Sequence, residues 1–469
     1  MLGAAMVAAA ALILWLDRAT TFNVDQIFVV LSSPQLELRE VFDSRNGHLG
    51  ATTTLLYKGL LEAFGSGDLA FRIAQVAAAL LAAGLFFALA KRRVGAVAAL
   101  APTLVLLFLG ADWPHVATSL GFTVLFSIAA GLGSLLALER GDRRGDVAAC
   151  VLLAISIVTF STGLAFLVGV AISVLLRGDR WRRAWIFAVP AALYMAWWLS
   201  ISWTSASGSD QVQLSNLLLI PGWAFSSLAA GAAALAGLAY DFRGEGSPEI
   251  DASWGPVLAV GAIVALALRI RRGSVPAALW AALGIAVTYW GLQALVADPG
   301  IRYPAKPQYV YPSAVLVLLV ALAALAPIRP TPRVTVALFA IAAFSLAGNL
   351  ALMRDGATYY REDYSAAARA QFAMLDLARP WVDEATLDLE SAAPGAPVLN
   401  TPADRYFEFV DHYGSPALSL SELAGESEEV RRRADQILAG ALGLGVEPAL
   451  GEAAPAGCER HRGGALAAP

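Results

Sequence analysis

Three groups of polar residues interrupt a chain that is otherwise dominated by apolar runs. They are Asp25, Asn46 and His48; Asp112 and His115; and Arg302, Tyr303 and Lys306. Carboxylate and imidazole groups transfer protons, and guanidinium and ammonium groups bind anions. Segments far apart in a sequence can converge over a helix bundle, so one shared site can draw on all three groups.

Each of these residues also has an ordinary structural interpretation. A loop acid such as Asp25 is commonly just solvated, and His48 taken alone is typical of a surface residue. Asp112 could cap the helix that follows it, and Arg302 and Lys306 could hold lipid headgroups at a membrane interface. No HExxH, Walker A, GxSxG or CxxC pattern occurs. The two cysteines indicate neither a metal site nor a disulfide framework.

The elements that must position these residues are membrane helices. The chain has 469 residues, of which 58% are hydrophobic and only 15% charged, with a mean hydropathy of +0.62. Soluble proteins carry about 25% charged residues and lack repeated long apolar runs. The sequence therefore predicts an all-α polytopic membrane protein. The net charge of −4 comes with no basic stripe, so nucleic acid is not an expected partner.

Arginine and lysine predict the topology, because short basic loops face the cytoplasm. The apolar runs are 2–16, 69–90, 94–110, 116–138, 147–160, 164–176, 184–202, 217–240, 254–268, 275–297, 313–327 and 334–353. Alternate connections hold fifteen basic residues, whereas the short ones between them hold three. Keeping the basic loops inside gives about eleven crossings, with the N-terminus cytoplasmic and the C-terminus outside. It also requires two short helices within 147–176, with an apex at Ser161 to Gly163, and a re-entrant or interfacial segment at 217–240.

The prediction divides the chain into a transmembrane domain over 1–353, a helical extracytoplasmic tail over 354–450 and a disordered end over 451–469. Within the first domain, the outer loop 17–68 should contain an amphipathic helix on the membrane, since Leu55, Leu56, Leu60, Leu61 and Phe64 recur at helical spacing. Tail helices are expected near 364–378 and 427–442. The second follows a capping-box pattern from Ser419 to Glu422.

This organisation resembles the GT-C superfamily of glycosyltransferases that use lipid-linked sugars, in particular a poorly characterised actinobacterial branch. Val24-Asp25-Gln26 matches an acidic first-loop motif, Asn46-Gly47-His48 matches Asn-Glu-His, and Arg302-Tyr303 matches a late Arg-Tyr pair. The tail sequence GSPALSLSEL, beginning at Gly414, is also similar to that group. The resemblance spans most of the chain and implies a location in the bacterial cytoplasmic membrane.

The resemblance implies a reaction on the outer side of the membrane. A sugar on a polyprenyl phosphate would pass to a hydroxyl of a cell-envelope glycan, lipid or protein, with inversion at the anomeric carbon. Asp25 would be the general base. Arg302 and Lys306 would stabilise the departing phosphate, and His48 would orient the acceptor or the phosphate. Asn46, Asp112, His115 and Tyr303 complete the expected substrate site.

Two departures from the family pattern leave alternatives open. The second acid of the first motif is Gln26, and the glutamate of the second motif is Gly47. Both changes count against a divalent cation held by paired carboxylates, so no cofactor is assigned and a divalent cation stays an open, less favoured alternative. They also favour a non-catalytic relative that binds polyprenyl phosphate or a partner protein. A transporter fits less well, because transporters place ionisable residues at mid-membrane.

Overall fold

The computed structural model describes residues 1–22, 24–44, 47–116, 118–204, 212–240, 248–298, 302–326, 330–382 and 403–444, with only the backbone of 24, 25 and 201–204. Among these residues the secondary structure is helical, with isolated β-bridges such as those between Tyr240 and Ile250 and between Asp298 and Arg302. The bundle helices are α1 (Leu2–Leu16), α4 (Leu69–Val94), α5 (Ala96–Leu107), α7 (Gly121–Leu138), α8 (Arg143–Thr159), α9 (Thr162–Leu175), α11 (Trp185–Thr204), α12 (Ile220–Ala236), α13 (Gly255–Arg271), α14 (Ala277–Leu295), α15 (Val310–Leu325) and α16 (Pro332–Tyr359).

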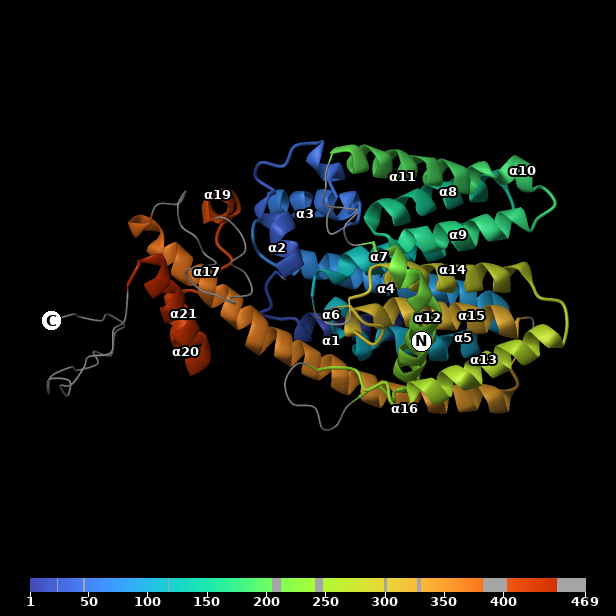
Figure 1. Cartoon of the computed structure of the whole chain (residues 1–469). Coiled ribbons are helices and arrows are strands. Elements are labelled where there is room, and N and C mark those ends of the chain that lie inside the picture. Colours follow the sequence, from blue (N-terminus) through green and yellow to red (C-terminus); the bar gives the residue numbers. More distant parts are fainter. Residues whose placement is uncertain are drawn as a thin grey trace.

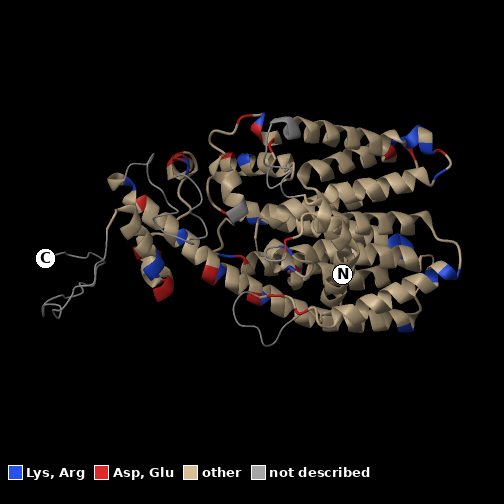
Figure 2. Cartoon of the chain, in the orientation of Figure 1, with Lys and Arg blue, Asp and Glu red and all other residues tan. Residues whose placement is uncertain are grey.

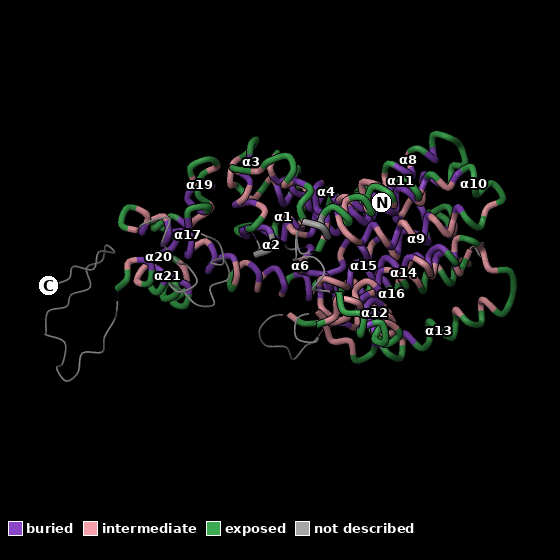
Figure 3. The backbone as a smooth tube through the Cα atoms, turned by 45° about the horizontal axis from the view of Figure 1, so that its top comes forward, coloured by how far each residue is buried: buried purple, intermediate pink, exposed green. Residues whose placement is uncertain are grey.

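Seven helical stretches in the described part of the chain are long and apolar enough to cross a membrane, and three more apolar helices are shorter. The predicted all-α multi-pass membrane protein is therefore confirmed. The number of eleven crossings is not. Figure 3 shows buried residues along the middle of the bundle, whereas α13 is largely exposed. The exposed side chains of α13 include Val257, Val260 and Ile263, which is the pattern of a lipid-facing helix.

Small residues let the central helices approach closely. A Cβ atom added at Gly131 of α7 would lie 2.3 Å from the Phe166 ring of α9. One added at Gly169 of α9 would lie 2.3 Å from Ile285 of α14. Helices α4 and α15 complete the same buried core. The core is therefore built on backbone-to-side-chain contacts that larger residues at these glycines would prevent.

The predicted break within residues 147–176 is confirmed. Helix α8 ends at Thr159, Phe160 is extended (φ −163°, ψ 156°), and α9 begins at Thr162. The reversal is tight, because a Cβ at Gly163 would lie 2.4 Å from the backbone nitrogen of Ile157. Helix α12, in the segment predicted to be re-entrant, runs across its neighbours in Figure 1 rather than alongside them.

The basic loops gather at one end of the bundle. Figure 2 shows Lys and Arg concentrated around α10 (Arg180–Arg183) and the C-terminal end of α13, and the tail lies at the opposite end. This common end is what the charge-based topology requires. The compartment that each end faces stays a prediction.

The first outer loop contains more helix than its sequence indicates. Helix α2 (Val24–Leu31), which was not predicted, precedes the short η1 (Glu40–Phe42) and the expected helix α3 (Ala51–Phe64). Helix α3 buries Thr54, Tyr57 and Leu61 against the protein, whereas Leu55 and Phe64 are exposed. The apolar face predicted for α3 is thus divided between the protein interior and the exposed surface, because Leu61 packs inside while Leu55 and Phe64 do not.

The last bundle helix does not stop where its apolar run ends. Helix α16 continues through a π-helical turn, η5 (Tyr360–Ser365), into α17 (Ala366–Ala378), and Figure 1 shows the result as one long orange helix. Tyr360 is buried in this turn and stacks on Tyr364, with ring centroids 4.9 Å apart. The tail helix expected near 364–378 is therefore an extension of α16, and the boundary expected at 353 falls inside that helix.

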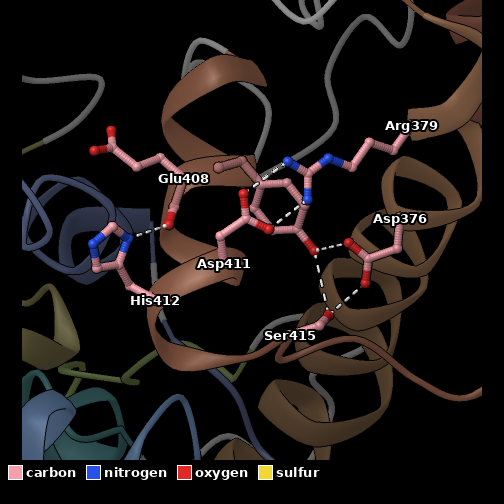
Figure 4. A network of polar contacts seen from close by, with 7 residues as sticks. Asp376, Arg379, Glu408, Asp411, His412 and Ser415 are labelled. Atoms are coloured by element: carbon pink, nitrogen blue, oxygen red, sulfur yellow. Dashed lines mark hydrogen bonds and ion pairs between the residues drawn. The ribbon is translucent and has the colours of Figure 1, made fainter.

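Helices α19 (Ala403–Tyr413), α20 (Leu420–Gly425) and α21 (Glu428–Ala441) form the rest of the described tail. The predicted α21 and the capping box at Ser419 are confirmed, although the box caps α20. Figure 4 shows how α19 is attached to α17. Asp376 accepts hydrogen bonds from Tyr406 at 2.9 Å and Ser415 at 2.5 Å, and Arg379 donates to both Asp411 oxygens at 2.7 and 2.9 Å. Residues 451–469 lie outside the described part.

Candidate functional site

The second outer loop is held tightly against α16. It consists of η2 (Gly110–Asp112) and α6 (Trp113–Val116), and the Ala111 backbone N–H donates to Asn349 Oδ1 at 3.1 Å. A Cβ atom at Gly110 would lie 1.8 Å from the Asn349 carbonyl oxygen, so only glycine allows this approach. Both η2 and α6 also contact η4 (Pro307–Tyr309). This short helix belongs to the connection 298–312, which the topology predicts as the fifth outer loop. Two of the three polar groups are therefore neighbours.

Asp112 and His115 form a buried pair. Asp112 is completely buried, and His115 is 6% exposed. His115 Nδ1 lies 3.0 and 3.1 Å from the two Asp112 oxygens, so an N–H at this position donates to the carboxylate. Gln75 of α4 donates to the His115 carbonyl oxygen at 2.9 Å. The Asp112 side chain thus orients an imidazole, in addition to the helix-capping role considered for it.

His48 joins the first outer loop to the apex between α8 and α9. Its Nδ1 lies 2.5 Å from Ser161 Oγ, and its ring packs on Phe160 with centroids 4.1 Å apart. Burial, together with the nearby positive charge of Arg302, lowers the pKa of His48 to about 4. The imidazole is therefore neutral at pH 7, and Arg302 lies close enough for its charge to act on it.

Arg302, Tyr303 and Lys306 are half-buried, but their side chains do not all face the same neighbours. Arg302 Nη1 donates to the Val296 carbonyl oxygen at 3.4 Å, and its charge reaches both His48 and Tyr309. Tyr303 Oη donates to Glu249 at 3.4 Å and so faces the segment that precedes α13 instead. The Lys306 backbone N–H donates to the Tyr303 carbonyl oxygen at 3.0 Å, which fixes the backbone turn between them.

The acidic motif of the first loop lies beside the second outer loop. Asp25 is the second residue of α2 and its side chain is outside the described structure, as is all of Asn46. The next residue, Gln26, is completely buried, and its Nε2 donates to Tyr57 Oη at 2.8 Å and to Ser119 Oγ at 2.7 Å. Where the family pattern has a second acid, this chain therefore has a neutral donor that joins α2 to α3 and to residue 119.

These interactions connect the predicted groups. Arg302 lies within electrostatic range of His48, and the buried Tyr311 lies within electrostatic range of Asp112. Tyr303 points away from this convergence. Within the described residues, no group of three or more His, Cys, Asp or Glu side chains is arranged to hold a metal ion.

A second buried polar cluster was not predicted. Arg72 of α4 donates to the Asp17 carbonyl oxygen at 2.6 Å and to Asp68 Oδ1 at 3.1 Å. Asp17 is 1% exposed, and neither of its carboxylate oxygens has a hydrogen-bond partner among the described residues. Burial raises the pKa of Asp17 well above its ordinary value. An arginine within the apolar run 69–90 was the available signal, because such a charge must find partners.

Two solved structures share this fold over nearly the whole chain. One is ArnT from Cupriavidus metallidurans bound to undecaprenyl phosphate, with a TM-score of 0.52, 15% sequence identity, and coverage of 92% of this chain and 87% of that chain. The other is ArnT from the same organism in the apo state, with a TM-score of 0.50, 15% identity, and coverage of 91% and 88%. No protein-family profile and no curated protein sequence matches the chain. ArnT is a GT-C glycosyltransferase, so the predicted resemblance is confirmed at the level of the fold.

Proposed function

We propose that this protein is a membrane glycosyltransferase that transfers a sugar from a polyprenyl phosphate to a hydroxyl acceptor of the cell envelope on the extracytoplasmic side. One observation carries the proposal. The fold is that of a protein whose structure holds undecaprenyl phosphate, and it places a histidine and an arginine from distant loops within electrostatic range of each other at the tail end of the bundle. Fold alone does not establish activity, so the residues must supply the rest.

Arg302 and Lys306 are assigned to the phosphate. Negative charge grows on the phosphate as the bond to the sugar breaks, and cations placed beforehand stabilise that charge. The guanidinium of Arg302 offers two parallel donors, and Lys306 offers a point charge. The His48 imidazole is neutral at pH 7, so the cations that face a bound phosphate in this proposal are Arg302 and Lys306.

Asp25 is assigned as the general base that takes the proton of the attacking hydroxyl, giving inversion at the anomeric carbon. The support is positional, because Gln26 fixes this turn of α2 against Tyr57 and Ser119. His48 is assigned to orientation. Its neutral ring can hydrogen-bond an acceptor or a phosphate oxygen through Nε2 while Nδ1 engages Ser161. Asp112 and His115 are assigned to the same substrate site.

The reaction needs no divalent cation in this proposal. The support comes from the residues that replace carboxylates, since Gln26 offers its amide hydrogens to protein partners and Gly47 has no side chain. The same two residues favour a second candidate, a non-catalytic protein that binds polyprenyl phosphate without transferring sugar.

Native mass spectrometry with a panel of polyprenyl-phosphate sugars would test the shared premise. Arg302→Ala should weaken retention of the preferred lipid. Arg39→Ala should not, because Arg39 is an exposed first-loop arginine whose partner is Glu37. Retention of no polyprenyl phosphate by folded protein would refute both candidates.

A transfer assay then separates the two candidates. Asp25→Asn should abolish transfer and preserve lipid retention if Asp25 is the base. A wild-type protein that retains the lipid but transfers no sugar to any envelope fraction would identify the non-catalytic relative.

A further inference from the structure

A cavity of about 110 Å³ lies at the basic end of the bundle, opposite the tail. It is enclosed by the ends of α4, α7, α9, α14 and α15. One face of α14 presents only alanines to it until Ile285, and this run of small side chains leaves the space open. A single water needs about 10–15 Å³ by this kind of measure, so the cavity holds several waters or one small polar group.

The charged residues of this cavity are unevenly paired. Glu139 accepts hydrogen bonds from Arg92 at 3.0 Å and from Arg93 at 3.1 Å, so two cations share one anion. Arg177 also lines the cavity, one helical turn beyond Ser173, and it has no ion-pair or hydrogen-bond partner for its side chain among the described residues. The charged side chains that line the cavity, Arg93, Glu139 and Arg177, leave one net positive charge at its mouth, and Arg92 adds a second next to it.

We propose that this cavity is a binding site for a phosphate group carried by an anionic membrane lipid. The positive mouth suits the phosphate, and the guanidinium of Arg177 can bind two of its oxygens. The cavity has room for the phosphate group alone, so the glycerol and the attached chains would lie outside its mouth. A bound phosphate would compensate the net positive charge at the mouth, where the partial burial of Arg93 and Glu139 reduces screening by water. The site is independent of the proposed glycosyl transfer, because Arg302 lies at the other end of the bundle.

The test uses the purified full chain and dioleoyl phosphatidylglycerol, with dioleoyl phosphatidylcholine as the zwitterionic comparison. Native mass spectrometry should show preferential retention of phosphatidylglycerol by the wild type. Arg177→Gln should weaken this retention about tenfold, which corresponds to one charge-assisted hydrogen-bond pair. Arg272→Gln is the matched control, because Arg272 is exposed at the same end, after α13, and does not line the cavity.

Ala282→Leu provides a second variant that leaves every charge in place. Ala282 is 5% exposed and lines the cavity, so leucine would fill part of it. Loss of phosphatidylglycerol in both Arg177→Gln and Ala282→Leu, with Arg272→Gln unaffected, would support the site. Stabilisation of the wild type, but not of Arg177→Gln, by inorganic phosphate alone would assign the same phosphate site to a soluble source.

Equal weakening by Arg177→Gln and Arg272→Gln would overturn the proposal, because it would reduce the effect to general attraction by a basic surface. Unchanged retention in both cavity variants would overturn it as well. Arg302→Ala should retain phosphatidylglycerol as the wild type does. A failed sugar-transfer assay would therefore not count against the lipid site. Loss of the lipid site would likewise not count against the proposed sugar transfer.

Discussion

Replacing Gln26 with glutamate keeps the shape of a completely buried side chain but removes its amide hydrogens. That amide donates to Tyr57 Oη at 2.8 Å and to Ser119 Oγ at 2.7 Å. The Tyr57 hydroxyl already donates its own hydrogen to the Ser119 carbonyl oxygen at 3.0 Å. A carboxylate at position 26 would therefore face a tyrosine oxygen that has no hydrogen left to donate.

The cost follows from these partners. Each lost neutral hydrogen bond removes about 1 kcal/mol, and an uncompensated buried charge adds several more, so we expect about 4 kcal/mol at pH 8. Burial raises the pKa of the new carboxyl above its usual value of about 4.3. Because the folded-state pKa is raised, the variant is most stable below the unfolded pKa and loses stability as the pH rises.

Thermal unfolding in detergent, followed by tryptophan fluorescence at pH 5 and pH 8, measures the effect. Gln26→Glu should lower Tm by about 5 °C or more at pH 8, and by less at pH 5. Gln213→Glu is the matched control, since Gln213 is exposed just before η3 (Leu214–Leu219) and its side chain makes none of these contacts.

A Gln26→Glu protein that unfolds at the wild-type temperature at both pH values would refute this account of position 26. A gain of sugar transfer that depends on a divalent cation would refute it too. That second result would mean that the position is a vacated acidic site rather than a buried support for the loop.

Three further predictions follow from other contacts. The pKa of His48 falls from 6.5 in the unfolded chain to about 4, so the unfolded state takes up the proton first and the protein should lose up to about 3 kcal/mol between these pH values. His48→Gln should flatten that part of the profile of Tm against pH. Gly110→Ala would place a Cβ 1.8 Å from the Asn349 carbonyl oxygen and should lower Tm by several degrees without changing the oligomeric state seen by size-exclusion chromatography. Arg183→Met leaves the buried Asp146 without the guanidinium that donates to both of its oxygens, at a cost of about 3–5 kcal/mol, and adding Asp146→Leu should restore most of it in a double-mutant cycle.

The sequence predicts the bundle well where apolar runs are long and bounded by charges. The run 69–90 becomes α4 (Leu69–Val94), because Lys91, Arg92 and Arg93 end the hydrophobicity but still favour a helix C-terminus. The break at Ser161 was predicted because the placement of arginines requires it. Both inferences use only hydropathy and the distribution of charge along the chain. Neither requires knowledge of contacts between distant segments.

The remaining features depend on packing between distant segments. The apolar run ends at Met353, but no proline closely follows it to end the helix, so α16 continues past Arg354 and Asp355 into the tail. The contact of His48 with Ser161 joins positions 113 residues apart, and no local pattern indicates it. Sequence reasoning likewise treated Gln26 as a missing acid, because its two partners become apparent only in the folded loops.

The continuity of α16, η5 and α17 has a mechanical consequence. At 1.5 Å per residue this rod is about 70 Å long, and the rest of the described tail is attached to its far end. A rotation of the rod about its axis would also turn Asn349, which holds the backbone of Ala111 next to Asp112. The tail is thus mechanically coupled, through this helix, to the backbone next to a buried carboxylate. A torque on the tail would reach the outer loops through helix rather than through a flexible connection.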